Sequence, residues 1–163
     1  MTITKAGFGI SVLLIVVMTC AFAVVARGET LKPADEIALS DQGQHSGQFT
    51  APDLSINYTY DRNGGNIQLN GTIQFRTNIQ ANFTAVQTFQ LGLALADARG
   101  NVLEQQGLTT AYDSDVGDAI NFSKTVTVPP GVASMAFTYT GQAYEAGSGG
   151  PDPTNFWFYP FNN

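Results

Sequence analysis

Residues 67–76 read Ile67-Gln-Leu-Asn-Gly-Thr-Ile-Gln-Phe-Arg76, and they alternate between apolar or small residues and polar residues. A period of two is the spacing of a β-strand, in which successive side chains point to opposite faces of a sheet. One face of this strand is suited to a core and the other to water, as is common in antiparallel sheets. The core face is made of Ile67, Leu69, Gly71, Ile73 and Phe75. The stretch therefore predicts an antiparallel sheet with one buried face.

The same period recurs along most of the chain that follows residue 53. The other alternating segments are residues 54–60, 89–95, 102–106, 120–128, 135–143 and 155–161. Between them lie clusters of Gly, Pro, Asp and Asn, the residues that form tight turns. About seven short strands with frequent turns, and no helical period after residue 40, predict an all-β antiparallel sandwich.

The most hydrophobic part of the 163-residue chain is residues 7–26, which contain no charged side chain. About 20 apolar residues can cross a bilayer as a helix, whereas the apolar region of a signal peptide usually has about 7–15. The length favours one N-terminal transmembrane helix after a short tail of residues 1–6, so we expect membrane contact through residues 7–26. Small residues at positions 21–26 also fit a cleavage site, and a removed signal peptide is the alternative.

Two further regions follow this segment. Residues 27–50 are interpreted as a tether, with a short helix expected over residues 32–39 and a flexible linker over residues 40–46. Residues 51–163 are expected to form the β-sandwich domain. A very short N-terminus before a β-rich domain favours export of the C-terminal part. We therefore expect a single-pass protein of a bacterial cell membrane, with its domain in the periplasm or on the cell surface.

The charge balance excludes one class of partner. Thirteen acidic residues against seven basic ones give a formal net charge of −6. A domain this acidic repels phosphate backbones, so we expect no nucleic-acid partner. The simplest interpretation of the charge is solubility.

Two segments resemble a known family of envelope domains. Leu69-Asn-Gly-Thr-Ile73, followed by Leu93-Ala-Leu-Ala-Asp-Ala-Arg-Gly-Asn-Val-Leu103, looks like the core hairpin of FxLYD-type and related immunoglobulin-like bacterial domains. The family pattern has Phe where this chain has Leu93 and Tyr where it has Ala96, and the match covers about a quarter of the chain. The resemblance implies an immunoglobulin-like sandwich and an envelope location, and it brings no active site with it.

The residue inventory argues against catalysis. His45 is the only histidine and Cys20, within the apolar segment, is the only cysteine. A Ser-His-Asp or Cys-His arrangement cannot be assembled in the domain, and a Cys/His zinc site lacks its ligands. The glycine pairs lack the strand–loop–helix context of a phosphate loop. We therefore expect no enzymatic activity and no cofactor.

Residues 109–118 are expected to form a loop that contains the best candidate metal site. Asp113, Asp115 and Asp118 place carboxylates at nearly alternate positions, which is how a loop can wrap a hard cation such as Ca²⁺. The spacing departs from an EF-hand, with Lys124 where the bidentate Glu should be. A solvated acidic loop is the alternative.

The C-terminal run Phe156-Trp-Phe-Tyr-Pro-Phe161 is the most aromatic part of the chain. Strand alternation puts Phe156 and Phe158 on one face, and Trp157, Tyr159 and Phe161 on the other. An edge strand can cover one face with its own core and leave the second for a partner or lipid headgroups. Complete packing on the domain's own core is the alternative.

These observations favour a non-enzymatic, membrane-anchored domain outside the cytoplasm. We expect an interaction or accessory subunit of a larger membrane protein complex, with the aromatic run as its interface. The alternative is an envelope module that binds a carbohydrate or Ca²⁺ on Trp157, Tyr159 and residues 113–118.

Overall fold

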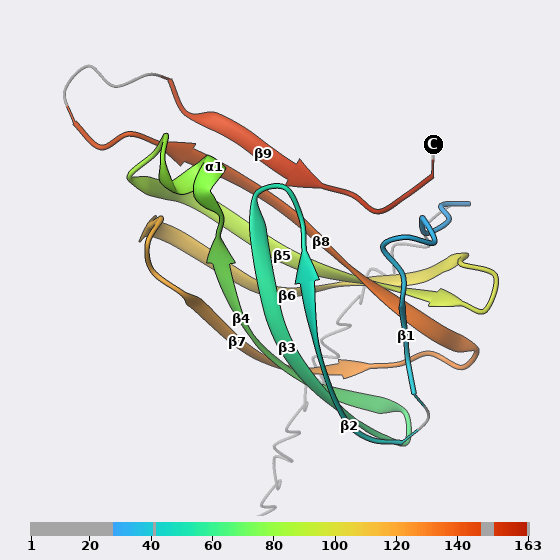
Figure 1. The fold of residues 1–163 in the computed structure, drawn as a ribbon. Helices are drawn as coiled ribbons and strands as arrows, with labels where there is room; N and C mark the ends of the chain where they lie inside the picture. Colours follow the sequence, from blue (N-terminus) through green and yellow to red (C-terminus); the bar gives the residue numbers. More distant parts are fainter. Residues whose placement is uncertain (1–27, 41, 148–151, 163) are drawn as a thin grey trace, which may run out of the picture.

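A computed structural model describes residues 28–40, 42–147 and 152–162, and these residues form nine strands in two antiparallel sheets (Figure 1). The five-stranded sheet contains β1 (Ile37–Ala38), β5 (Ala85–Asp97), β6 (Val102–Asp115), β8 (Val132–Tyr144) and β9 (Thr154–Phe158). The four-stranded sheet contains β2 (Gly43–Thr50), β3 (Leu54–Asn63), β4 (Asn66–Phe75) and β7 (Ile120–Thr127). One helical turn, α1 (Thr77–Gln80), follows β4. The predicted all-β antiparallel sandwich is confirmed.

The strand order shows how the sheets are linked. The four-stranded sheet runs β2-β3-β4-β7, and the five-stranded sheet runs β1-β8-β5-β6, with β9 also paired to β8. The chain passes from β4 to β5 and from β7 to β8, so it changes sheets at both steps. Because β4 pairs with β7 and β5 pairs with β8, these two crossings interlock the sheets.

The core lies between the sheets and is rich in aromatic rings. The predicted inward face of β4 is confirmed, since Ile67, Leu69 and Ile73 are fully buried. Phe75 from β4 meets Phe89 from β5 edge-on, with ring centroids 5.4 Å apart. Such contacts bury large apolar areas and favour a specific packing.

A partly buried hydrogen bond joins the five-stranded sheet to the turn before β3. Tyr139 of β8 is 1% exposed, and its hydroxyl donates to Oδ2 of Asp53 over 2.9 Å. Burial and this hydrogen bond raise the pKa of the Tyr139 phenol, so it stays protonated and remains a donor. Asp53 also accepts a hydrogen bond from Nδ2 of Asn78 over 2.8 Å, which ties the residues after β4 to the same carboxylate.

Part of the expected tether belongs to the sandwich. Residues 43–50 form β2, which pairs with β3 along its whole length, and residues 37–38 form β1. The expected helix over residues 32–39 is wrong, because a turn at residues 33–35 leads into β1. β2 lacks an apolar alternation because it is an edge strand in which Phe49 alone is buried.

The expected loop at residues 109–118 is also wrong over most of its length. β6 continues to Asp115 and pairs with β5 as far as Ala85. Apart from Ala111, which is partly buried against the core, this half of β6 carries polar or exposed side chains, because β6 is the edge strand of its sheet. Pairing with β5, more than an apolar face, holds it in place.

The first described residues lie beside the last ones. The backbone N–H of Lys32 donates to the carbonyl of Pro160 over 2.7 Å, and that of Asn162 donates to the carbonyl of Thr30 over 2.8 Å. Leu31 and Phe161 form an isolated antiparallel bridge. The blue and red ends of the ribbon in Figure 1 meet here. The chain therefore enters the domain next to its C-terminal residues.

The expected membrane segment, residues 7–26, lies outside the described residues. Within residues 28–40, 42–147 and 152–162, no helix has both the length and the apolar character needed to cross a bilayer.

Candidate functional site: the outer face of the five-stranded sheet

β9 divides its aromatic side chains between the two faces of the sheet. Phe156 is 6% exposed and packs against Phe75 and Phe89, with ring centroids 5.9 and 6.4 Å away. Trp157 and Tyr159 point the other way and are 62% and 49% exposed. The predicted alternation of the aromatic run is therefore present, with one face in the core and the other in solvent.

Phe158 and Phe161 complete this division. Phe158 packs on the main core, where its ring stacks at 5.7 Å on that of Tyr139. Phe161 is partly buried against a small apolar cluster on the outer side of the sheet, and its ring stacks on Tyr159 at 6.2 Å. That cluster contains Leu31, Ala94, Ala96, Val102 and Ala136. The Tyr159 ring is thus held in place from one side by Phe161.

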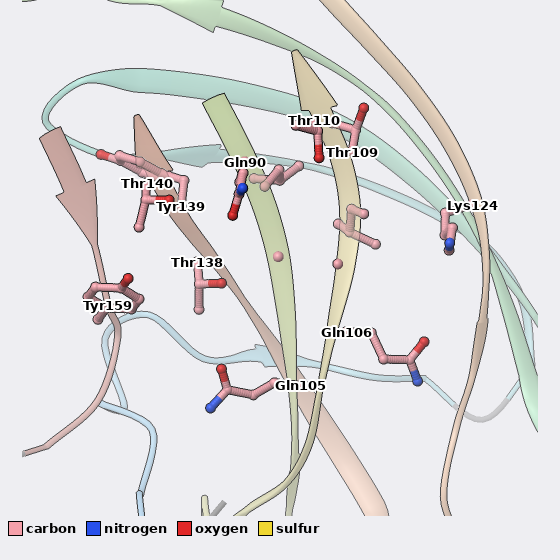
Figure 2. Close-up of a pocket in the computed structure, with 14 residues that line it drawn as sticks. Gln90, Gln105, Gln106, Thr109, Thr110, Lys124, Thr138, Tyr139, Thr140 and Tyr159 are labelled. Atoms are coloured by element: carbon pink, nitrogen blue, oxygen red, sulfur yellow. The ribbon is translucent and has the colours of Figure 1, made fainter. Parts of the chain in front are cut away.

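Beside Tyr159 a groove crosses the outer face of the sheet, with a volume of ≈ 460 Å³ (Figure 2). Its floor is a cross-strand row in which Gly92 of β5 pairs with Gly107 of β6 and with Thr138 of β8. The pairing of β5 with β6 shifts register between Leu91 and Gly92. Glycines without side chains lower the surface here, and bulges of this kind are common next to binding sites.

Neutral polar side chains form the walls of the groove. Gln90 stands between Thr110 and Thr140 in the row above the floor, and Trp157 pairs with Thr140 at the end of that row. Gln105 stands on the opposite wall (Figure 2). Lys124 is the one charged residue that lines the groove, at the end away from Tyr159. The groove thus presents amides and hydroxyls with little charge.

The outer face of the four-stranded sheet is arranged differently. Its polar side chains bond to one another across the strands: Thr72 donates to Asn121 over 2.7 Å, and Ser123 donates to Asn70 over 2.7 Å. Gln68 joins the same network through Thr125, at 2.6 Å. These groups satisfy one another within the sheet.

The three aspartates of the candidate Ca²⁺ loop are not arranged as a metal site. Asp113 and Asp115 lie in the last part of β6, and Asp118 follows in the turn, all three exposed. Oδ1 of Asp115 accepts a hydrogen bond from the backbone N–H of Gly117 over 2.7 Å, which is an ordinary turn contact. Asp113 has a φ of 46°, a left-handed conformation that Asp tolerates. Over the described residues, no three His, Cys, Asp or Glu side chains group as metal ligands would.

His45 lies on β2, away from the outer face of the five-stranded sheet. Its ring stacks on Tyr60 with centroids 4.9 Å apart, and its Nε2 lies 3.0 Å from the carbonyl oxygen of Gln42. The ring has a packing role against the end of β3.

Reasoning from the sequence identified the aromatic edge of this face and missed the groove. Gly92, Gly107 and Thr138 become neighbours only through strand pairing with a register shift, which the sequence does not show. A usable signal was present in Gly92, a glycine inside the apolar stretch 91–96 of β5, because such glycines often mark a close approach by another group.

Comparisons of the chain with protein families, with curated proteins and with solved structures gave no match.

Proposed function

We propose that this protein is a non-enzymatic recognition module, held outside the cytoplasm by residues 7–26 as a membrane anchor, that serves as an accessory subunit of a larger membrane complex. The observation that carries the proposal is the exposure of Trp157, on β9, and of Tyr159, directly after β9. Exposing a large aromatic side chain to water is energetically unfavourable, and exposed pairs of aromatic side chains are typical of binding surfaces.

The fold supports a placement among immunoglobulin-like envelope domains. Two antiparallel sheets joined by interlocked crossings at β4/β7 and β5/β8 are typical of that class. The resemblance of residues 69–73 and 93–103 to FxLYD-type domains agrees with this placement. The chain departs from antibody domains, because Trp157 is exposed and Cys20 lies before the domain, so neither a buried tryptophan nor a disulfide marks the core.

The absence of catalysis rests on the residue inventory. The single histidine packs on Tyr60 and the single cysteine is at position 20, so the domain offers no second histidine as a base and no cysteine nucleophile. The Ca²⁺ alternative has no support in the arrangement of Asp113, Asp115 and Asp118.

Extraction of the full chain from its native membrane tests the proposal. We expect the wild-type chain, solubilised in mild detergent, to elute from a sizing column in an assembly much larger than its 17.4 kDa mass. The Trp157→Ala/Tyr159→Ala variant is expected to shift to the position of the free chain. Tyr112→Ala is the matched control, because Tyr112 is 66% exposed on β6 and does not line the groove. Elution of the wild-type chain alone would contradict the proposal.

The anchor has a separate test. N-terminal sequencing of the protein recovered from washed membranes is expected to begin within residues 1–6. A mature N-terminus near residue 27 would show that residues 7–26 act as a cleaved signal.

A further inference from the structure

The groove next to Tyr159 has the dimensions of a ligand site. Its volume of ≈ 460 Å³ lies within the range of about 300–1,000 Å³ that is usual for small-molecule sites. It crosses β6, β5 and β8 toward β9, and three strand spacings of about 4.8 Å make roughly 14 Å. A groove of that length suits a chain of several units better than a single small molecule.

Hydrogen-bonding groups in the groove are free to meet a ligand. Within the described part of the chain, the side chains of Gln90, Thr110 and Thr140 make no hydrogen bond to another residue, and neither does Thr138, which is 8% exposed and lies over Gly92. An amide offers two donors and two acceptor sites, and a hydroxyl offers one donor and two acceptor sites. The opposite wall is already positioned, because Nε2 of Gln105 donates to Glu29 over 2.9 Å.

The floor of the groove is kept open by its glycines. A Cβ on Gly92 would lie 2.5 Å from Oγ1 of Thr138, so a side chain there would displace the hydroxyl. A Cβ on Gly107 would have no atom within 4 Å, so the space above Gly107 is empty. On the core side of the sheets, by contrast, aromatic rings cover two strand glycines. Phe156 lies over Gly141, and Phe122 lies over Gly71.

Aromatic rings border the groove on one side only. Tyr159 lines the groove and also two further hollows that share lining residues with it, one beside Trp157 and Thr140 and the other beside Gln105 and Lys32. A half-exposed ring held from behind by Phe161 offers a flat apolar platform to whatever lies in the groove.

We infer that this groove binds a neutral saccharide chain, with Tyr159 and Trp157 as stacking platforms and Gln90, Thr138 and Thr140 as hydrogen-bonding partners. The inference rests on the proposed function, because it names what the recognition face binds. A sugar ring combines an apolar face of C–H groups with a rim of hydroxyls, and the groove combines aromatic faces with amides and hydroxyls. Lys124 is the one charged residue in the lining of the groove, at its far end, so the lining as a whole suits a neutral ligand.

A glycan array probed with the detergent-solubilised full chain tests the inference. We expect binding to neutral glycans, followed by measurable heats when the bound glycan is titrated as a free oligosaccharide in a calorimeter. Tyr159→Ala is expected to weaken that affinity by about tenfold or more, and Gln90→Ala by several-fold. Tyr112→Ala, an exposed aromatic outside the groove, is expected to leave it unchanged.

Gly107→Val provides a variant that fills the groove from its floor. Because its Cβ meets nothing, the domain is expected to fold with an unchanged melting temperature while glycan binding is lost. Binding that survives in Gly107→Val or in Tyr159→Ala would overturn the assignment to this groove.

The outcomes separate this inference from the proposed function. If no neutral glycan is bound while the wild-type chain still elutes in a Trp157-dependent assembly, the saccharide inference is overturned and the face contacts a polypeptide. If neutral glycans are bound while the chain elutes alone, the recognition site stands and the role as a subunit fails.

Discussion

The outer faces of the two sheets have similar compositions and opposite organisation. On the four-stranded sheet, Thr72 and Asn121 bond to each other across neighbouring strands, as do Ser123 and Asn70. On the five-stranded sheet, Gln90 and Thr140 are paired neighbours whose side chains do not bond to each other or to other described residues. The named pairs on the first face therefore satisfy each other, whereas Gln90 and Thr140 on the second have donors and acceptors available for a ligand. The composition of these two rows is alike, and the hydrogen bonding between their side chains distinguishes them.

The largest effect is expected where β9 holds the open face to the core. Phe156→Ala removes a ring that packs against Phe75, Phe89 and Tyr139. Replacing a buried Phe by Ala costs about 3–5 kcal/mol. Urea denaturation is expected to show that loss of stability. Trp157→Ala, one residue further on the exposed face, should change the free energy of unfolding by no more than about 0.5 kcal/mol. Equal losses in the two variants would mean that β9 is not divided between core and solvent.

Two glycine substitutions compare Gly71, which an aromatic ring covers, with Gly107, which faces open space. A Cβ on Gly71 would lie 2.6 Å from the Phe122 ring, so Gly71→Val is expected to destabilise the domain by about 1–3 kcal/mol. Gly107→Val is expected to leave stability nearly unchanged, because its Cβ meets open space. Thermal melting of both variants beside the wild type provides the measurement. A large loss in Gly107→Val would show that the groove is filled in solution.

A smaller effect is expected from matched threonine substitutions. Thr72→Val breaks the 2.7 Å hydrogen bond to Asn121 without changing the shape of the side chain, and a typical hydrogen bond contributes about 0.5–1.5 kcal/mol. Thr140→Val breaks no such bond and is expected to stay within about 0.5 kcal/mol of the wild type. A double-mutant cycle of Thr72→Val with Asn121→Ala isolates the coupling on the closed face. A coupling free energy of zero between Thr72 and Asn121 would contradict the proposed difference between the two faces.

The smallest effect is an acid dependence confined to one hairpin. The Asn101 side chain, assisted by the backbone N–H groups of Arg99 and Asn101 and by the charge of Arg99, holds the pKa of Asp97 below its ordinary value of 3.8, although desolvation acts in the opposite direction. The ionised form therefore stabilises the β5–β6 turn above pH 3.8, and that contribution is lost as the pH falls through the lower pKa of the folded state. The turn between β3 and β4, residues 63–66, has no carboxylate, so this acid dependence is expected in the β5–β6 hairpin and not in the β3–β4 hairpin.

Melting curves of the wild type and of Asp97→Asn at several pH values test this dependence. The difference in melting temperature between the two proteins is expected to be constant at neutral pH and to shrink below about pH 3.8. A difference that does not change with pH would show that Asp97 acts through its shape alone.

The inner strands could be predicted because each has a buried face. The alternation at Ile67, Leu69 and Ile73 predicted β4, and the turn at residues 97–101 predicted the hairpin that the Asp97 side chain closes. The edge strands β2 and the second half of β6 could not be found this way. Their position is set by hydrogen bonds to a neighbouring strand, and edge strands need little apolar surface.

The candidate site could be predicted only in part for a related reason. Alternation along the aromatic run predicts that Trp157 and Tyr159 share one face, but the sequence leaves open whether that face is exposed or packed on the core. The groove depends on the register of Gly92 against Gly107 and Thr138, three residues from three strands. The register of strands across a bulge is set by their pairing in the assembled sheet, and it cannot be predicted from a single sequence.

The bonds between residues 30–32 and 160–162 have a mechanical consequence. Lys32 is joined to Pro160, which follows Tyr159 directly, and Asn162 is joined to Thr30 through both backbone and side chain. A force applied to a ligand bound at Tyr159 would therefore be transmitted through these hydrogen bonds to residues 30–32, where the chain enters the domain. The load would bypass the sandwich core, so the domain could hold a ligand under tension without being drawn open itself.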